Sequence, residues 1–592
     1  MSEPKGMLDT SVNGPEDPPG VFDADAWQQV DWRTHEERVR RLRRRIFKAV
    51  RDGDLAKVRN LQKLMLRSWS NTLISVRQVT QRNAGRATAG IDGRVALTAQ
   101  ARAEVAVQVH ATRSSWRPVA VKRVYIPKAH DKTKMRPLGI PVIMDRCHQA
   151  RVRQALEPEW EARFEARSYG FRPGRGCHDA IQSLFITLAG RAKRVWILDA
   201  DLAGAFNTIS HDHILASVGG FPARALIAGW LKAGIVEAGT GFAPTTEGVP
   251  QGGVISPLIL NIALHGLEEA AGVRYQTGAR AEKVTVNSPA VTRYADDLVV
   301  CCHTRQQAEQ AKARLAAWLA PRGLAFNEAK TRIVHLTEGC DFLGFNLRRY
   351  RNGKLLIKPS PTVIKEFRKR LAKEFRALRG ANVAAVLAKI VPIVRGWVAY
   401  YRTVVSSRVY AILTDYLWKL TYKWACWNHP HKPKRWIVQR YYGKFDKFRG
   451  DRWVFGDRNT GAYLPKPSWT DIVRHTLVKG RASPDDPGLT RYWAQRRRRV
   501  KPPLDSYTVR LLSKQDARCT LCGDDLLTLE DPPQTPQGWE WWYLWVTKKA
   551  IAADHLVHHD QPGKSRDQRT HLVHAHCSRT RHPVRATAGT AQ

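Results

Sequence analysis

Two short groups of aspartates lie inside apolar stretches with β-strand character. Asp199 and Asp201 lie in VWILDADLAGAF, and Asp296 and Asp297 lie in RYADDLVV. Carboxylates flanked by strand residues need a cationic partner, because burying unpaired charge is costly. Two Mg²⁺ ions about 4 Å apart, shared by carboxylates of neighbouring strands, would supply that charge and organise an in-line phosphoryl displacement. The alternative is a solvated β-hairpin tip, so YADD alone is only moderately specific.

A second pattern, near the C-terminus, has the spacing of metal ligands. Cys519-x-x-Cys522 is followed by His574-x-x-Cys577. Two chelating pairs of this kind hold one tetrahedral structural zinc ion. The alternative is a CxxC turn that coincides with a His-rich tail. The chain has only nine cysteines, too few for a disulfide scaffold, and three of them fall in this pattern, which favours zinc.

The composition indicates a polyanionic partner. The 592 residues include 97 Lys+Arg and 53 Asp+Glu, giving a formal net charge of +44. Such a surplus points to nucleic acid and, less well, to an anionic membrane. The membrane alternative is weakened because no run of 18 apolar residues is visible and the first 30 residues are acidic and rich in Pro and Gly. We expect a reducing, cytoplasmic location.

The elements that must position these residues alternate between strands and helices. Residues 27–81 read as amphipathic helices with a basic outer face, and residues 361–442 read as helices rich in Trp and Tyr. Between about 120 and 350, β-rich stretches alternate with helices, which predicts an α+β fold. These stretches are VKRVYIP, VWILDADL, VTRYADDLVVCC and IVHL.

The ordered motifs resemble those of a known family. RPLGIP, DADLAGAF, EGVPQGGVISPLILNI and YADD resemble the blocks of a reverse transcriptase. TAGIDG, SYGFRPGRGCHDAI, GLAFNEAKT and DFLGF make the chain similar to the group II intron-encoded proteins in particular. The resemblance covers roughly residues 60 to 592 in colinear order. It implies an α+β multidomain protein: a right-hand polymerase whose fingers and palm contain an antiparallel sheet, an α-helical thumb or maturase domain, and a small zinc-bound HNH-like ββα module.

The same resemblance sets the expected domain boundaries. We predict a mobile leader over residues 1–25, an N-terminal helical basic extension over 26–85, the reverse transcriptase fingers and palm over 86–355, the thumb or maturase domain over 356–445, a basic DNA-binding linker over 446–510, and the HNH-like zinc module over 511–592.

For the polymerase site, the resemblance implies that Asp201 and Asp296 ligate both Mg²⁺ ions and that Asp297 is the third carboxylate. Asp199 shares a strand face with Asp201. The family pattern, however, places the metal ligand five residues before the aromatic residue, which is Asp201 before Phe206. Phe206 resembles the steric gate that favours dNTPs over NTPs. The alternative for Phe206 is an ordinary core residue.

Further residues are implied to bind the nucleotide. Gln251, in the PQG loop, resembles the residue that contacts the template-pairing nucleotide. Lys128, Lys134 and Arg136 lie in the finger-like segment, where cations would hold the triphosphate. A basic loop such as the one around Lys134 is also commonly just a solvated surface.

The stretch PIVRGW…YYR at 392–402 resembles the maturase signature, and aromatic residues interleaved with cations suit RNA. For any one aromatic residue here, a place in the helical core is the alternative. The expected RNA-binding residues are Arg395, Trp397, Tyr401, Arg402, Lys432, Lys434 and Arg435.

The tail resembles an HNH endonuclease motif that it does not fully match. Asp554 and His555 look like its start, with His555 as the catalytic base. The expected Asn and final His positions hold Arg569 and Ser578. We therefore expect a degenerate HNH-like module that binds DNA and whose nuclease activity is doubtful. The aromatic cluster at residues 539–545 either packs the module or binds single strands, and we favour packing.

The expected function follows from these parts. We expect a reverse transcriptase and maturase that binds group II intron RNA, assists splicing, and copies the intron into DNA from dNTPs with two Mg²⁺ ions and a structural Zn²⁺. Target DNA is the further partner, no membrane is expected, a homodimer stays open, and the expected location is the nucleoid of a prokaryotic cytoplasm. The alternatives are a polymerase-silent RNA-binding splicing factor and a domesticated reverse transcriptase without an intron.

Overall fold

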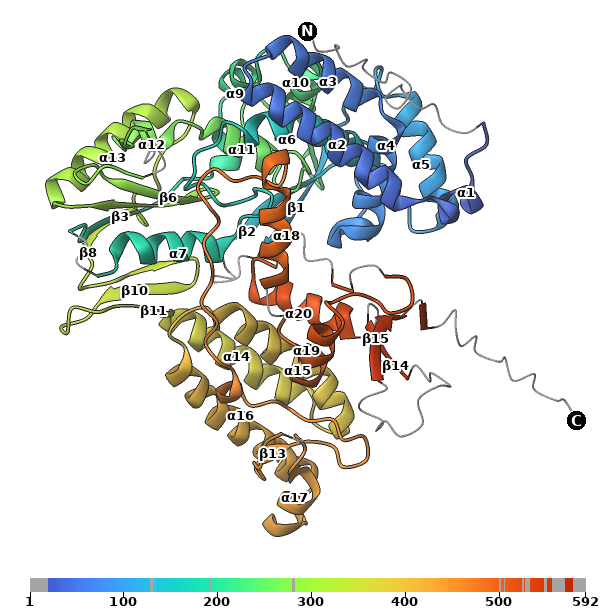
Figure 1. The fold of residues 1–592 in the computed structure, drawn as a ribbon, viewed down its shortest axis with the longest axis vertical. Helices are drawn as coiled ribbons and strands as arrows, with labels where there is room; N and C mark the ends of the chain where they lie inside the picture. Colours follow the sequence, from blue (N-terminus) through green and yellow to red (C-terminus); the bar gives the residue numbers. More distant parts are fainter. Residues whose placement is uncertain are drawn as a thin grey trace, which may run out of the picture. The chain divides into compact units, whose positions relative to one another are not determined.

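The fold is described from a computed structural model of the 592-residue chain. The described residues are 20–127, 133, 135–190, 193–278, 283–446, 448–499, 502–504, 506–523, 526–527, 533–547, 551–555, 570–575 and 577–578. The chain divides into two compact units (Figure 1). The first unit combines residues 1–175, 191–335 and 478–491, and the second combines residues 176–190, 336–477 and 492–592.

The first unit contains two four-stranded sheets and most of the N-terminal helices. Its helices are α1 (Ala24–Gln29), α2 (Trp32–Arg51), α3 (Leu55–Arg67), α4 (Trp69–Arg77), α5 (Ala99–Ala111), α6 (Ile143–Glu161), α8 (Ala205–Thr208), α9 (His211–Val218), α10 (Arg224–Lys232), α11 (Ser256–Ala263), α12 (Leu267–Ala270) and α13 (Arg305–Leu319). Its strands are β1 (Val121–Pro127), β2 (Met135–Ile140), β3 (Trp196–Asp201), β4 (Ile235–Glu237), β5 (Gly241–Ala243), β6 (Ala290–Tyr294), β7 (Asp297–Cys302) and β8 (Arg332–His335).

The strand order positions the acidic motifs. One sheet has the order β6-β7-β3-β8, and every pairing within it is antiparallel, as expected for the palm. Its central strands β3 and β7 contribute a nearly continuous buried apolar face, because Leu198, Leu298 and Val300 are fully buried. The other sheet has the order β2-β1-β4-β5 and carries the finger-like segment.

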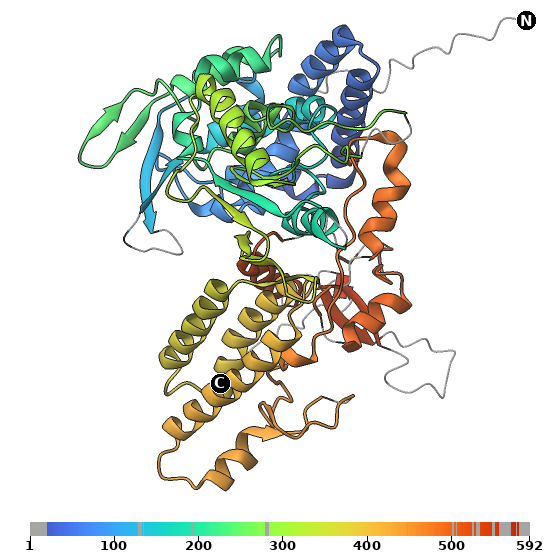
Figure 2. The same cartoon turned by 90° about the vertical axis from the view of Figure 1, so that its left-hand side faces the viewer.

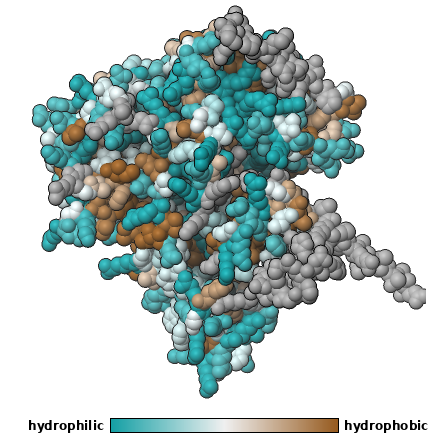
Figure 3. Space-filling model, in the orientation of Figure 1, coloured by the Kyte–Doolittle hydropathy of each residue, from teal (hydrophilic) through white to brown (hydrophobic). Residues whose placement is uncertain are grey.

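The basic N-terminal helix α2 is amphipathic. Its N-terminus is capped by Asp31, whose carboxylate accepts from the backbone N–H of Arg33 and Thr34. Leu42 and Ile46 are buried on its inner face. The outer surface over α2 is mainly hydrophilic (Figure 3).

One arginine of this basic run is buried. Burial alone would lower the pKa of Arg43, but the carboxylates of Asp485 and Glu157 outweigh that cost and raise it. The guanidinium donates to Asp485 at 2.8 and 2.6 Å and to Glu157 at 2.9 Å. Arg175 in turn donates to the carbonyls of Gly480 and Ala482 at 2.7 and 3.0 Å. These contacts fix the returning segment 478–491 to the first unit.

The second unit is built around a helical bundle. Its helices are α7 (Cys177–Leu188), α14 (Pro361–Ala377), α15 (Val383–Tyr401), α16 (Ser407–Asn428), α17 (Lys434–Tyr441), α18 (Thr490–Arg499, which begins in the first unit), α19 (Ser506–Lys514) and α20 (Pro536–Trp545). Its strands are β9 (Cys340–Phe342), β10 (Phe345–Arg349), β11 (Leu355–Pro359), β12 (Tyr442–Gly443), β13 (Val454–Phe455), β14 (Ile551–His555) and β15 (Thr570–His574). Helices α14, α15 and α16 run side by side (Figures 1 and 2).

Helix α15 forms the core of this bundle. Among the described residues, α15 is long and apolar enough to cross a membrane, with a mean hydropathy of 1.6, and 61% of it is buried inside the protein. Its Trp397 ring stacks on Phe367 of α14 with centroids 4.8 Å apart. The apolar length of α15 therefore has a packing explanation within the second unit.

Helix α20 packs closely on α15 within the second unit. A Cβ added at Gly396 would lie 2.6 Å from both the Glu540 nitrogen and the Pro536 oxygen, so only glycine permits this approach. Arg370 of α14 donates to both carboxylate oxygens of Glu540 at 3.1 and 2.8 Å. Within the 539–545 cluster Trp539 is buried, whereas Trp541 is 73% exposed. Packing, the role that we favoured for residues 539–545, therefore accounts for the side of α20 that carries Trp539.

The compact units do not coincide with the predicted domain boundaries. The sheet β11-β10-β9 belongs to the second unit, although we placed residues up to 355 with the fingers and palm. Residues 176–190 also belong to the second unit. The predicted linker at 446–510 is divided, because residues 478–491 pack into the first unit. The predicted leader at 1–25 lies almost wholly outside the described residues.

Candidate polymerase active site and zinc cluster

The antiparallel register brings the two acidic motifs together in the first unit. Asp201, the last residue of β3, is directly opposite Asp297, the first residue of β7. Asp296 lies in the tight turn between β6 and β7. Asp199 is paired with the guanidinium of Arg332, with 3.3 Å between Oδ2 and Nε. The choice of Asp201 over Asp199 as the metal ligand stays a prediction.

The turn that carries Asp296 is held in a specific conformation. Ala295 has a φ of 58°, in the left-handed region that is unusual for a residue with a side chain. The buried Arg293 donates to the Ala295 carbonyl at 3.1 Å, to Asn261 Oδ1 at 2.9 Å and to Ser168 Oγ at 2.6 Å. Gly170 packs so closely that an added Cβ would clash with the Ala295 nitrogen. The surrounding contacts thus stabilise the strained residue.

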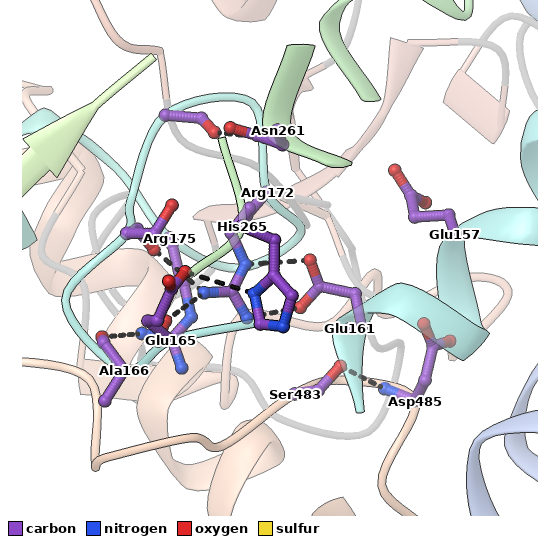
Figure 4. A network of polar contacts seen from close by, with 12 residues as sticks. Glu157, Glu161, Glu165, Ala166, Arg172, Arg175, Asn261, His265, Ser483 and Asp485 are labelled. Carbon is purple, nitrogen blue, oxygen red and sulfur yellow. Dashed lines mark hydrogen bonds and ion pairs between the residues drawn. The ribbon is translucent and has the colours of Figure 1, made fainter. Parts of the chain in front are cut away.

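A buried ion pair supports the loop beneath this turn. Arg172 and Glu161 form two parallel hydrogen bonds of 2.9 Å, and each side chain is only 1% exposed. Arg172, which Figure 4 shows beside Glu161 and Glu165, also donates to the carbonyls of Glu165 and Ser168 at 2.7 and 2.9 Å. Because the same loop supplies Ser168 and Gly170 to the hairpin, the ion pair positions the catalytic turn indirectly.

The three carboxylates repel one another. Burial raises the pKa of Asp297 to about 7, and the charges of Asp296 and Asp201 add to the shift. Burial also raises the pKa of Asp296, with Asp201 contributing, while Arg136 and Lys330 act in the opposite direction. A cluster that resists ionisation at neutral pH is a site where divalent cations replace protons. The oxygen-only donor set fits Mg²⁺.

Two residues beside Asp201 were missed by the sequence analysis. Lys330 Nζ lies 2.6 Å from Asp201 Oδ2. The backbone N–H of Asn327 donates to the Asp201 carbonyl at 2.8 Å, and its side-chain amide lies 3.4 Å from Oδ2. Both residues belong to the motif GLAFNEAKT, which was used for the family resemblance but not examined residue by residue.

The predicted nucleotide-binding residues are partly described. Phe206 is half-buried, and its carbonyl accepts from Val249 at 2.6 Å. Gln251 lies in a loop joined to β2, because its carbonyl accepts from Gly139 at 2.8 Å. Arg136 is exposed on β2 and acts electrostatically on Asp296. Lys128 and Lys134 lie outside the described residues. The roles assigned to these side chains stay predictions.

The predicted RNA-binding residues of the second unit separate into two groups. Trp397 and Tyr401 are 4% and 2% exposed, which corrects their assignment to RNA contact: the rings fill the bundle core, the alternative that we named. Arg395 is half-buried over the Tyr543 ring, 5.6 Å from its centroid, and Arg402 is half-buried with its pKa lowered by burial. The exposed cations of this group are Lys432, just before α17, and Lys434 and Arg435 in its first turn.

The predicted zinc ligands converge in the second unit. One ligand atom each from Cys519, Cys522, His574 and Cys577 lies within 4.8 Å of every other. Burial raises the pKa of Cys519, but backbone N–H groups, that of Cys522 foremost, more than compensate and lower it to about 6. Burial and the neighbouring thiols raise the pKa of Cys577 to about 12. One Zn²⁺ ion would relieve the repulsion between these sulfurs, so the donor set fits zinc.

The cluster is supported by a small core and a strand pair. Leu511, Leu572 and Val573 are buried around it, and β14 pairs antiparallel with β15. Ser578 occupies the position where the HNH motif has a histidine. The backbone of His555 ends β14, but its side chain and Arg569 lie outside what the structure describes.

Comparison with known proteins places these parts in families. Residues 126–347 match the reverse transcriptase (RNA-dependent DNA polymerase) family, residues 27–109 the N-terminal domain of reverse transcriptase, and residues 364–442 the group II intron maturase-specific domain. A telomerase from Candida albicans in complex with a telomeric RNA fragment aligns at 12% identity with a TM-score of 0.31, covering 55% of this chain and 61% of that one.

Several curated proteins are similar in sequence. Protein YkfC of Escherichia coli is 34% identical over 361 residues, which is 56% of this chain and 93% of YkfC. The group II intron-encoded protein LtrA of Lactococcus lactis is 29% identical over 40% of this chain, and the match spans about half of LtrA, 48%. Maturase-like protein 1 of Euglena gracilis is 23% identical over 64% of this chain and 79% of its own length. The chain belongs to the family of group II intron-encoded reverse transcriptases and maturases.

Proposed function

We propose that this chain binds its intron RNA, assists its splicing and copies the RNA into DNA by adding dNTPs to a primer 3′ end. The observation that supports the proposal best is the cluster of Asp201, Asp296 and Asp297 at the junction of β3 with the β6–β7 turn. A polymerase site without activity would not need three adjacent carboxylates, because their mutual repulsion is unfavourable unless metal ions neutralise it.

The three aspartates would hold two Mg²⁺ ions. These ions would neutralise charge on the transferred phosphoryl group and activate the primer hydroxyl. The strained turn at Ala295 fixes where the Asp296 carboxylate points. Lys330, 2.6 Å from Asp201, holds that carboxylate before the metals bind. Arg136 is exposed on β2 and so is accessible to a triphosphate.

Primer extension on an RNA template tests the polymerase proposal. We expect the intact chain to extend a DNA primer with dNTPs and Mg²⁺, and Asp296→Ala to abolish extension. Glu309→Gln is the matched control, because Glu309 is an exposed carboxylate on α13 that pairs with Arg305 at 3.0 Å. An intact chain that binds RNA and promotes splicing without extending primers would contradict the proposal and favour the silent maturase.

We further propose that the C-terminal segment is an HNH-like zinc module that binds target DNA without cutting it. Support comes from the Cys519, Cys522, His574 and Cys577 cluster, from the β14–β15 pair, and from Ser578 at a ligand position of the motif. Metal analysis should find one zinc per chain, lost in Cys522→Ser. Incubation with duplex DNA and Mg²⁺ or Mn²⁺ should give no nicking. Nicking that disappears in His555→Ala would overturn the claim that the module does not cleave.

A further inference from the structure

A hollow on the second unit lies between helix α16 and the segment on both sides of β13, residues 453–468. Its volume is about 450 Å³, within the range of small-molecule sites. Two tryptophans from segments far apart in the sequence, Trp418 and Trp453, line it together with Thr414, Asp415, Lys466 and Ala411. None of these residues belongs to the polymerase site or to the zinc cluster.

Both tryptophans leave ring surface open to solvent. Trp418 is 37% exposed and Trp453 is 53% exposed. One face of Trp418 stacks on Tyr422, with ring centroids 5.5 Å apart and an angle of 9° between the planes. Trp453 has Tyr442 beside it, 6.2 Å away and tilted by 58°. Trp418 is therefore supported on one face by a stacked ring and Trp453 has one tilted ring beside it, and these contacts reduce the conformational entropy lost when a ligand stacks on the indoles.

The wall opposite α16 is fixed by one carboxylate. Asp451 accepts from the backbone N–H of Trp453 at 2.9 Å and from Lys466 Nζ at 2.6 Å. Burial raises the pKa of Asp451, but the hydrogen bonds from Lys466 and from the Trp453 N–H, together with the nearby positive charges, outweigh burial and lower it. The hydroxyl of Thr414 on α16 accepts from the Ser468 N–H at 3.0 Å and so joins the two walls. The hollow is organised before any ligand arrives.

The chemistry of the lining indicates the ligand. Aromatic faces stack on nucleobases. The Asp415 carboxylate pairs with Lys419 at 2.8 Å and has further lone pairs that can accept from an exocyclic amino group. The Lys466 ammonium, which donates to Asp451, has further N–H groups that can donate to a phosphate. The exposed cations Lys419, Lys423 and Arg452 lie close in sequence to the lining residues. A duplex keeps its bases stacked inside, so only an unpaired base could enter the hollow.

We propose that this hollow is a slot for an unpaired nucleobase of RNA. The proposal deepens the function proposed above, because it assigns one contact of the RNA-binding chain to a defined site. RNA is favoured over single-stranded DNA because α16 lies within residues 364–442, which match the maturase-specific domain.

The test uses the full chain and a 12-nucleotide single-stranded RNA of mixed sequence at about 0.5 M KCl, where the salt-dependent phosphate contribution to binding is suppressed. Because each variant loses one base–aromatic stacking contact, we expect Trp418→Ala or Trp453→Ala to bind the RNA about 5- to 150-fold more weakly. Trp453→Phe should restore most of the affinity, since it keeps an aromatic face. Ala411→Trp should weaken binding without removing any contact, because it fills the hollow from an exposed helix position.

Trp427→Ala is the matched control. Trp427 also lies on α16 and is 51% exposed, but it does not line the hollow. Equal losses in Trp427→Ala and Trp418→Ala, or unchanged affinity in both Trp453→Ala and Ala411→Trp, would overturn the slot. DNA of the same sequence that binds as tightly, with the same losses, would overturn the assignment to RNA. A wild-type chain that binds no intron RNA even at low salt, where phosphate contacts are strong, would instead overturn the proposed function.

Discussion

Replacing Asp297 by asparagine should inactivate the polymerase and yet stabilise the metal-free protein. The pKa of Asp297 is raised from 3.8 to about 7, because the carboxyl is buried beside Asp296 and Asp201. The folded state therefore binds more protons than the unfolded state between about pH 4 and pH 7, and its stability falls as the pH rises through that window. Asparagine has the shape of the protonated acid and carries no charge.

The size of the effect follows from the shift. A difference of about 3 pKa units corresponds to about 4 kcal/mol for the charged form above pH 8. Because the carboxylates titrate together, we expect about half of this, ~2 kcal/mol, to appear in Asp297→Asn. For a unit of this size the gain in melting temperature should be about 4 °C at pH 8 in EDTA, and it should vanish near pH 4.

Thermal unfolding, monitored by fluorescence, measures the gain in melting temperature of Asp297→Asn. We would compare this gain at pH 8 and at the lowest pH where the protein stays folded. Saturating Mg²⁺ should raise the melting temperature of the wild type more than that of Asp297→Asn, because the ions replace the missing protons. Glu309→Gln should change neither the melting temperature in EDTA nor its increase with Mg²⁺. A lower melting temperature for Asp297→Asn in EDTA at pH 8, or a gain that is independent of pH, would refute the electrostatic reasoning.

Three further outcomes are expected. Gly170→Ala should reduce primer extension at least tenfold with little change in RNA binding, since the added Cβ collides with the backbone of the turn at Ala295; unchanged extension would show that the turn relaxes freely. Lys330→Gln should move the acidic limb of the extension rate to higher pH, because the lysine lowers the pKa of both Asp296 and Asp297; a pH–rate profile measures it. Gly396→Val should detach α20 from α15 and expose the C-terminal segment to limited proteolysis, because its Cβ would lie 2.6 Å from the backbone of α20; a wild-type digestion pattern would contradict this.

The strands of the catalytic sheet could be predicted because their sequences are apolar with isolated acids. The stretch VWILDADL contains β3, and RYADDLVV contains the end of β6 and most of β7. The pairing of Asp201 with Asp297 came from the family resemblance, since no local pattern fixes a register across 96 residues. Lys330 was missed because a lone lysine in a helix-like stretch has no signal of its own.

The aromatic residues of α15 show where a sequence pattern cannot distinguish a buried side chain from an exposed one. Trp397 and Tyr401 are four residues apart, a spacing that serves equally for a buried helix face and for an exposed stacking face. Only the packing of Trp397 on Phe367 decides between these alternatives. The return of residues 478–491 to the first unit was likewise invisible, because its contacts depend on partners such as Arg43, more than 400 residues earlier.

Each unit is assembled from segments that lie far apart in the sequence, and this has a consequence for biosynthesis. Arg43 pairs with Glu157, but its second carboxylate partner, Asp485, becomes available only after residues 336–477 have been translated. At roughly 5–20 residues per second, a ribosome spends about seven to thirty seconds on that interval. Throughout this time Arg43 lacks one of its two carboxylate partners. Folding of the N-terminal half is thus tied to completion of the C-terminal half, and a gene truncated after the maturase helices would encode a polymerase that lacks its closing segment.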